Sequence, residues 1–395
     1  MNCLVNLGNR ITERICKLRL LLIVNVDWFF ISHRLPIALE AQEKGYIVTI
    51  ACHFTKHKQE LIAMGFSVVD IPFSRSGSGV INELNTLKVI RKVIKEVNPS
   101  LIHAVTIKPV LYTGLVLKTL NRNIPFVAAI SGLGYVFTAS TLRAKLTRLI
   151  VSAFYKVALS QKHKTVIFQN TSDESILTGV AKLKANAKVL IKGSGADLSV
   201  YNYLPENSID NIKIVMACRL LKEKGVYEYV ASAKLVKEQY PETEFLLVGT
   251  PDLENPNTVK QAEIDGWVKD GLIKYLGHSN DIPKVFSDAN IVCLPSFYGE
   301  GVPKVLIEAA ACGRAIVTTD NPGCKDAIID GETGILVPIR DAQALSKAII
   351  TLIKDPSLRN DMGKKARVFA VKEFDVKAVV AKHLDIYKKL LERCE

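Results

Sequence analysis

Two carboxylates eight positions apart are the first residues of this chain that suggest a chemistry. Glu300 stands between Gly299 and Gly301, shortly after an apolar run that ends at Leu294, and Glu308 follows in a helix-like segment. At 1.5 Å per helical residue the separation is roughly 12 Å or less. A carboxylate at each end suits two groups of hydroxyls on one ligand. An isolated E-x7-E match is also compatible with two ordinary surface acids.

The residues that follow Glu300 favour a binding site. Gly301, Val302 and Pro303 come between the apolar run and the helix, with the proline near the first helical turn, where proline is tolerated. The free N–H groups and the positive dipole end of that helix suit a phosphate or a sugar oxygen. This segment therefore predicts a site for a ligand that carries hydroxyl and phosphate groups.

A pair of cations follows another apolar run, at 212–218. Arg219 and Lys224 stand at the expected carboxyl end of this strand, where they can neutralise the charge that grows on a diphosphate as it leaves. A solvated basic turn is the alternative, but the Glu300 segment favours the functional interpretation. Lys222 is expected to be a bystander.

The first half of the chain offers further candidates for ligand contacts. His33 and Arg34 follow the first apolar run and are expected to meet an acceptor phosphate or hydroxyl; a plain helix start is the alternative. Gly132 and Gly134 follow another expected strand. Glycines at such a position allow a backbone to approach a ligand closely.

These residues must be positioned by an alternation of short β-branched runs and helices, which predicts an α/β fold with parallel, doubly wound sheets. One helix is expected over 32–44. The expected strands of a first unit are 18–26, 46–52, 67–71, 101–104, 126–130 and 165–169, and those of a second are 212–218, 244–248, 272–276, 291–294 and 315–319.

The pattern predicts two Rossmann-like domains that face each other across a cleft. We expect an N-terminal domain over 1–198, a C-terminal domain over 199–375, and a last helix over 376–395 that crosses back to the first domain. Ligands of such sheets sit beyond the carboxyl ends of the strands, so the cleft is the expected site.

The net charge of +13 is distributed unevenly: residues 1–190 carry +15 and the remainder −2. No acidic residue occurs between Glu96 and Asp173, and the segment 142–164 mixes basic with apolar residues. A basic amphipathic helix suits anionic lipid headgroups; a plain helix with a solvated basic face is the alternative. No motif supports a nucleic-acid partner.

The eight cysteines contain no CxxC pair, which indicates a reducing cytoplasm and no metal site. No run of about 18 uncharged apolar residues exists to span a bilayer, and no secretory signal is evident. We expect a cytoplasmic protein peripherally associated with the inner face of the membrane.

The arrangement R-x4-K-G followed by G-E-G-x-P and E-x7-E resembles the retaining nucleotide-sugar glycosyltransferases of family four, which have the GT-B fold. It is similar, more narrowly, to bacterial enzymes that extend lipid-linked sugars for O-antigen, capsule or protein glycans. The resemblance covers the chain from about Lys17. It implies a UDP-sugar donor and no metal or other cofactor.

The resemblance also implies roles for the domains and for single residues. The domain over 1–198 would face the acceptor and the membrane, and the domain over 199–375 would bind the nucleotide-sugar donor. Arg219 and Lys224 would hold the diphosphate, Glu300 the donor sugar and Glu308 the ribose. The remaining donor contacts would come from the backbone at Gly301, Val302 and Pro303, and from Gly249, Gly277 and His278 beside the diphosphate and base.

The chain departs from the family at one position. Many members carry H-x-H where this chain has His103 followed by Val105, so the second histidine is absent. His103 is either a core histidine or a cleft residue, and Lys108 or Thr106 is left to face the ligand. A retaining transfer can proceed without this histidine when the leaving phosphate takes the acceptor proton.

The predicted activity is transfer of a hexose or N-acetylhexosamine from a UDP-sugar to a polyprenyl-diphosphate-linked saccharide. Two alternatives remain: a nucleotide-sugar epimerase of GT-B type, for which the first domain shows no convincing pair of carboxylates, and a non-catalytic nucleotide-binding module on the membrane.

Overall fold

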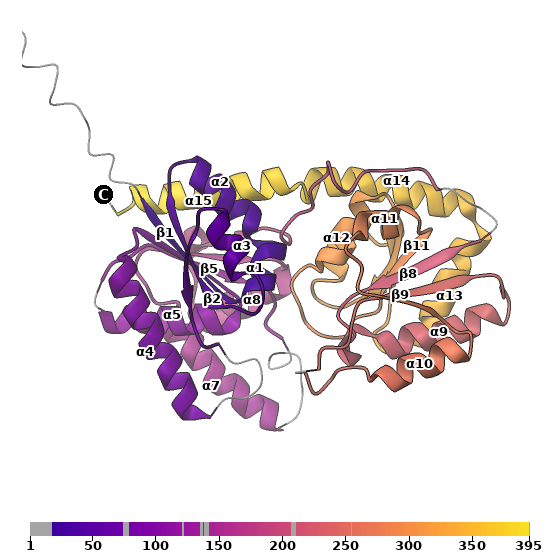
Figure 1. Ribbon diagram of the computed structural model, residues 1–395, viewed down its shortest axis with the longest axis horizontal. Helices are drawn as coiled ribbons and strands as arrows, with labels where there is room; N and C mark the ends of the chain where they lie inside the picture. Colours follow the sequence, from indigo (N-terminus) through magenta and orange to yellow (C-terminus); the bar gives the residue numbers. More distant parts are fainter. Residues whose placement is uncertain are drawn as a thin grey trace, which may run out of the picture.

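Two parallel sheets form the frame of the protein, shown in Figure 1. The computed structural model describes residues 18–73, 79–120, 122–134, 137, 142–206, 211–253 and 255–394; side chains of residues 142–146, in the predicted basic segment, lie outside the described part. The first sheet has the order β3-β2-β1-β4-β5-β6-β7 and the second β10-β9-β8-β11-β12-β13, which confirms the predicted fold class.

The strands are short, and the central ones are buried on both faces, as expected for a parallel sheet covered by helices. Those of the first sheet are β1 (Arg19–Val26), β2 (Ile47–His53), β3 (Ser67–Asp70), β4 (Leu101–Val105), β5 (Phe126–Ile130), β6 (Lys164–Phe168) and β7 (Lys188–Leu190). Those of the second are β8 (Lys213–Ala217), β9 (Glu244–Val248), β10 (Lys274–Gly277), β11 (Ile291–Leu294), β12 (Ala315–Thr319) and β13 (Gly334–Val337).

Helices cover both faces of each sheet. The first domain has α1 (Asp27–His33), α2 (Leu35–Glu43), α3 (Lys58–Ala63), α4 (Val80–Val97), α5 (Ile107–Leu120), α7 (Leu142–Ala158) and α8 (Thr171–Ala181). The rest are α9 (Val226–Lys237), α10 (Gln261–Lys269), α11 (Ile282–Ser287), α12 (Lys304–Ala311), α13 (Ala342–Lys354), α14 (Pro356–Glu373) and α15 (Val376–Glu392). No helix in the described ranges combines the length and apolar composition needed to cross a bilayer.

The structure differs from the expected elements in three places. The single helix expected over 32–44 is two helices, α1 and α2, separated at Arg34, which adopts φ −133° and ψ −13°. Pro36 explains the break, because it lacks the N–H that a continuous helix would use. The edge strands β7 and β13 were not expected. They have three and four residues, too few to show a periodicity.

The last helix, α15, packs on the first domain, although α14 before it packs on the second. Its side chains Val379, Ile386 and Tyr387 join the core on one face of the first sheet, together with Leu22 and Val24 of β1. In Figure 1 the two yellow helices run along the top of the molecule and bridge both domains.

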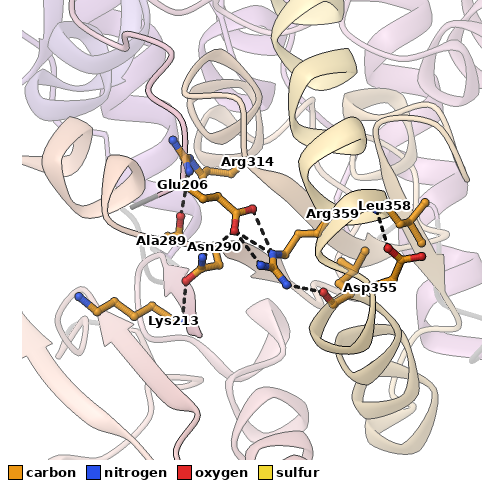
Figure 2. Close-up of polar contacts among 9 residues, drawn as sticks. Glu206, Lys213, Ala289, Asn290, Arg314, Asp355, Leu358 and Arg359 are labelled. Atoms are coloured by element: carbon orange, nitrogen blue, oxygen red, sulfur yellow. Dashed lines mark hydrogen bonds and ion pairs between the residues drawn. The ribbon is translucent and has the colours of Figure 1, made fainter. Parts of the chain in front are cut away.

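The chain between the domains is anchored by a buried ion pair, drawn in Figure 2. The Glu206 carboxylate accepts hydrogen bonds from Arg359 Nε and Nη2 at 2.8 to 3.0 Å and from Asn290 Nδ2 at 2.8 Å. The Arg359 side chain is fully buried. Arg314 donates to the carbonyl oxygen of Ala289 at 3.2 Å beside this pair. These contacts fix the end of the connecting segment against α14.

Candidate active site

Both sheets present their switch points to a cleft between the domains. Strand order reverses between β1 and β4 in the first sheet and between β8 and β11 in the second, and ligands bind beyond strand ends at such points. Three adjoining cavities of about 480, 260 and 700 Å³ lie there. Arg219 lines all three, Glu300 lines the first and third, and Glu308 the first and second.

Lys224 and Glu300 form an ion pair at the centre of the cleft. Lys224 Nζ lies 2.5 Å from Glu300 Oε2, and Ser296 Oγ donates to Glu300 Oε1 at 2.8 Å. Gly225 (φ +82°) lets the turn carrying Lys224 pack tightly, because a Cβ there would lie 2.1 Å from the carbonyl oxygen of Pro295. Burial acts to lower the pKa of Lys224, but the Glu300 carboxylate outweighs burial and the pKa is raised. Lys224 is therefore a cation.

Arg219 reaches across the cleft to the first domain. Its guanidinium lies 5.6 Å from the centroid of the Trp28 ring in α1, and Nη1 lies 3.3 Å from Asp252 Oδ2. The side chain remains 49% exposed. A planar guanidinium with five N–H donors can meet a phosphate while these contacts hold its orientation.

Glu308 points into the cavities from α12. Its Oε1 accepts a hydrogen bond from the Tyr201 hydroxyl at 2.7 Å and lies 3.5 Å from Lys304 Nζ. Burial raises the pKa of Glu308, although the charge of Lys304 and the Tyr201 hydrogen bond oppose it. Oxygens held in this way can accept hydrogen bonds from sugar hydroxyls.

The smallest of the three cavities lies between the ends of β8, β9 and β10. Gly249 and His278 line it, and the Gly249 N–H donates to the carbonyl oxygen of Gly277 at 2.7 Å. Gly249 has φ +127°, and a Cβ there would lie 1.8 Å from the carbonyl oxygen of Cys218. Only glycine allows this approach of the two strand ends.

The three loop residues after Glu300 line the 480 Å³ cavity. They are Gly301, Val302 and Pro303. Pro303 is the N-cap of α12, so that helix begins one residue after it. The N–H groups of Leu306 and Ile307 donate to the Pro303 carbonyl oxygen, and helix starts of this kind can direct their remaining N–H groups at an anion.

On the first-domain side, His33 lines the same cavity and Arg34 does not. The His33 ring stacks on Phe29 with centroids 4.2 Å apart. Burial, and then the charges of Arg34, Lys304 and Lys224, lower the pKa of His33 to about 3, so the imidazole is neutral. Arg34 is buried behind it and donates from Nη1 to the His33 carbonyl oxygen at 2.9 Å.

His103 does not line the three cavities. It is fully buried in the first domain, and its Nδ1 lies 2.6 Å from the Tyr387 hydroxyl of α15. Burial, and then the charges of His383 and Arg34, lower the pKa of His103 well below its usual value. In this chain the position therefore holds a neutral core histidine.

Lys108, Gly132 and Gly134 line the 700 Å³ cavity, and Thr106 joins them. Lys108 Nζ lies 2.8 Å from Glu83 Oε1, so this ammonium is neutralised by a neighbouring carboxylate. Thr106 has φ +75°, a conformation that is unfavourable for a β-branched residue and that occurs most often at functional sites.

The two glycines of the first domain permit an approach of the second domain. A Cβ on Gly132 (φ +104°) would lie 2.7 Å from Glu300 Cα, and one on Gly134 (φ +67°) would lie 2.5 Å from the Tyr298 hydroxyl. The Gly301 N–H also donates to the carbonyl oxygen of Ser131 at 3.2 Å. The close approach is therefore between two protein loops.

Several residues of the site carry no sequence signal. Tyr201 donates a hydrogen bond to Glu308, and Asp252 accepts one from Arg219. Asn170, in the first domain, donates from Nδ2 to the Glu300 carbonyl oxygen at 3.2 Å. Each partner is far away in sequence, so spacing could not reveal it. Among the residues that the structure describes, no group of three histidine, cysteine or acidic side chains could hold a metal ion.

Two family models match the two halves of the chain. Residues 202–369 match "Glycosyl transferases group 1" and residues 19–170 match "Glycosyl transferase 4-like". Together the two matches cover about four fifths of the chain and include every cation and carboxylate of the cleft described above, whereas Tyr201 lies between the two matched ranges.

Two relatives of known name match long stretches of the chain. The chain is 29% identical over 384 residues to the N,N'-diacetylbacillosaminyl-diphospho-undecaprenol alpha-1,3-N-acetylgalactosaminyltransferase of Campylobacter jejuni. The aligned region covers 92% of this chain and 98% of the relative. It is 24% identical over 262 residues to a capsular polysaccharide biosynthesis glycosyltransferase of Staphylococcus aureus, covering 66% and 68%.

Among solved structures, Anabaena HepE in complex with UDP has a TM-score of 0.74 at 18% identity and covers 94% of this chain and all of that chain. This likeness shows the fold. With both halves matched by family models, the chain belongs to the family-four glycosyltransferases and has the GT-B fold.

Proposed function

We propose that the protein transfers a hexose or N-acetylhexosamine from a UDP-sugar to a polyprenyl-diphosphate-linked saccharide, with retention of anomeric configuration. The observation that carries this proposal is the convergence of Arg219, Lys224 and Glu300 on one cavity between the domains. The name of the Campylobacter relative supports a lipid-diphosphate acceptor, and the UDP in the Anabaena structure supports the donor class.

In this proposal the donor lies across the two smaller cavities. The base and ribose occupy the space beside Gly249 and His278, with the ribose hydroxyls on Glu308, and the diphosphate lies against Arg219 and Lys224. The two cations stabilise the charge that develops as the glycosidic bond breaks. They replace a metal ion, so we propose that no cofactor is needed.

The acceptor enters through the 700 Å³ cavity, which ends at Glu300. Glu300 positions the donor sugar, and the leaving phosphate oxygen takes the proton of the acceptor hydroxyl. The neutral His33 imidazole offers a hydrogen bond in the cleft without competing for the diphosphate charge.

We further propose that the first domain docks on the inner leaflet of the cytoplasmic membrane through α7. Ile150, Phe154 and Val157 lie on one side of this helix and are 45 to 52% exposed, beside Arg148 and Lys156. An exposed apolar stripe with flanking cations suits an interface with anionic lipids.

Transfer of radiolabel from a panel of UDP-sugars to lipid-linked acceptors in membranes tests the activity. We expect activity that Arg219→Ala and Glu300→Ala each reduce strongly; normal activity in both variants would remove the mechanism. Product formed without an acceptor would favour an epimerase, and UDP binding without turnover a non-catalytic module.

Sedimentation with phosphatidylglycerol vesicles tests the docking. Ile150→Ser with Phe154→Ser should reduce binding, and Val368→Ser with Val371→Ser, at exposed positions of α14, is the matched control. Equal binding by both double variants would contradict the proposed orientation.

A further inference from the structure

A fourth and smaller cavity lies on the first domain, outside the cleft. It has a volume of about 180 Å³ and lies between the connection from α5 to β5 and the connection from α7 to β6. Its polar lining comes from Lys118, Arg122, Asn123, Ser160, Gln161, Lys162 and His163.

This cavity is at the opposite edge of the sheet from the active site. Its connections enter β5 and β6, so it lies at their amino ends, whereas the cleft lies at the carboxyl ends. Each strand has five residues, which separates the two edges by roughly 16 Å of strand. A ligand here would not share contacts with the donor.

The lining is cationic and, among its described residues, contains no carboxylate. Lys118 and Lys162 are both exposed, and within the described part of the chain neither makes an ion pair. The surrounding sequence has no acidic residue from 97 to 172. The positive charge of the cavity is therefore available to an external anion.

The side chains around the cavity are held in place by neutral partners. Arg122 Nη1 donates to Asn98 Oδ1 at 3.1 Å, and Gln161 Nε2 donates to the Gly114 carbonyl oxygen at 2.5 Å. Lys164 Nζ donates to the Gln161 carbonyl oxygen at 2.9 Å. Burial, and then the like charges of Lys118 and Lys184, lower the pKa of Lys164. An anion would relieve this repulsion.

We propose that this cavity binds a phosphate group, as a phosphomonoester or phosphodiester, at a site separate from the donor site. Its volume is below the roughly 300 Å³ at which pockets for drug-sized ligands begin, so it suits a phosphate or small headgroup but not a nucleotide sugar. Lysine and arginine supply charge-assisted hydrogen bonds to such oxygens.

Two sources can supply this chemistry. The exposed Phe154 and Val157 lie on the last two turns of α7, which leads directly into the cavity at Ser160. A lipid headgroup would therefore reach the cavity from the apolar stripe of α7. A soluble phosphorylated metabolite would reach it from solvent.

Lysine acetylation followed by mass spectrometry tests the site on the full-length wild-type chain. Inorganic phosphate, and separately vesicles of phosphatidylglycerol, should slow labelling of Lys118 and Lys162 several-fold relative to Lys88 and Lys95, which are exposed on α4 of the same domain. Phosphatidylcholine vesicles serve as the neutral comparison. Equal protection of all four lysines by both probes would overturn the proposal.

A pair of double variants provides an independent measurement by calorimetric titration. Lys118→Ala with Lys162→Ala should weaken binding of phosphate or of phosphatidylglycerol vesicles at least tenfold, whereas Lys88→Ala with Lys95→Ala should not. If Lys118→Ala with Lys162→Ala weakens only the binding of vesicles, the phosphate comes from a lipid. If it weakens the binding of both probes, the site recognises the phosphate group itself. Unchanged binding of both probes would refute the site. Neither experiment depends on sugar transfer.

Discussion

Lys224 and Glu300, 76 residues apart in sequence, form a hydrogen-bonded ion pair of 2.5 Å at the point where the two domains meet. Both side chains are mostly buried, with exposures of 15% and 18%. Removing one partner leaves the other as a poorly solvated charge, so the two residues act as one unit toward a ligand.

Lys224→Ala should lower kcat by about 100- to 1000-fold, the usual loss when a fixed electrostatic stabiliser is removed. Lys222→Ala is the matched control, because Lys222 is an exposed cation two residues away that lines none of the cleft cavities. Initial rates of sugar transfer measure both. If Lys222→Ala lowers the rate as much as Lys224→Ala does, the effect comes from the general positive charge of this turn and not from the position of Lys224.

Glu308→Ala should weaken UDP binding by about 10- to 100-fold, since a hydrogen bond to a charged group contributes about 1.5 to 3 kcal/mol. Tyr201→Phe should have a smaller effect, because it removes only the hydroxyl that orients the carboxylate. Calorimetric titration with UDP gives both values. Wild-type affinity in Glu308→Ala would show that the ribose lies elsewhere.

Gly132→Ala should abolish most of the activity while the domains stay folded. The new Cβ would lie 2.7 Å from Glu300 Cα, on a residue with φ +104°, so the loop carrying Glu300 must move. Gly266→Ala, in α10 with no atom within 4 Å of the new Cβ, is the control. Transfer rates and circular dichroism separate a displaced loop from an unfolded chain.

Arg359→Ala should reduce the free energy of unfolding by about 3 to 5 kcal/mol, because it leaves the Glu206 carboxylate buried without its cation. Lys365→Ala, which breaks the exposed pair with Asp361, should leave the unfolding midpoint unchanged. Urea denaturation measures both variants. Similar midpoints would show that the anchor in Figure 2 adds little stability.

Stability should fall as the pH is lowered from about 6.5 toward 3. Burial, and then the charge of Arg34, lower the pKa of His383 to about 3 in the folded chain, whereas an unfolded histidine has a pKa near 6.5. Between these values the unfolded chain binds the proton and the folded chain does not, so unfolding is favoured. His383→Leu should flatten this dependence in denaturation curves collected from pH 7 to 4. An unchanged slope would contradict the neutral state of this histidine.

The fold and the centre of the cleft were predictable because their signals are local. Arg219 and Glu300 each follow a short apolar strand within a few residues, and parallel strands of one sheet end at the same edge. The structure brings both to a common cavity. Strand order cannot be read in this way, and the edge strands β7 and β13 were too short to detect.

The contacts that position these groups were not predictable from the sequence. Tyr201 meets Glu308 over 107 positions, and Trp28 meets Arg219 from the other domain. Gly132 was expected beside a ligand because glycine allows close approach. The close approach exists, but the neighbour is the loop of Glu300. A backbone requirement can be read from a glycine, whereas the identity of its neighbour depends on how the domains meet.

The return of α15 to the first domain has a consequence for how the chain is made. Helix α2 and strand β6 are synthesised well before α15, which packs against both and adds Val379 and Tyr387 to their core. Until α15 has left the ribosome, the apolar core that Val379 and Tyr387 complete is uncovered on this side. Nascent or truncated chains should therefore expose an apolar surface that is prone to aggregation and depend on chaperones, even when most of the first domain is complete.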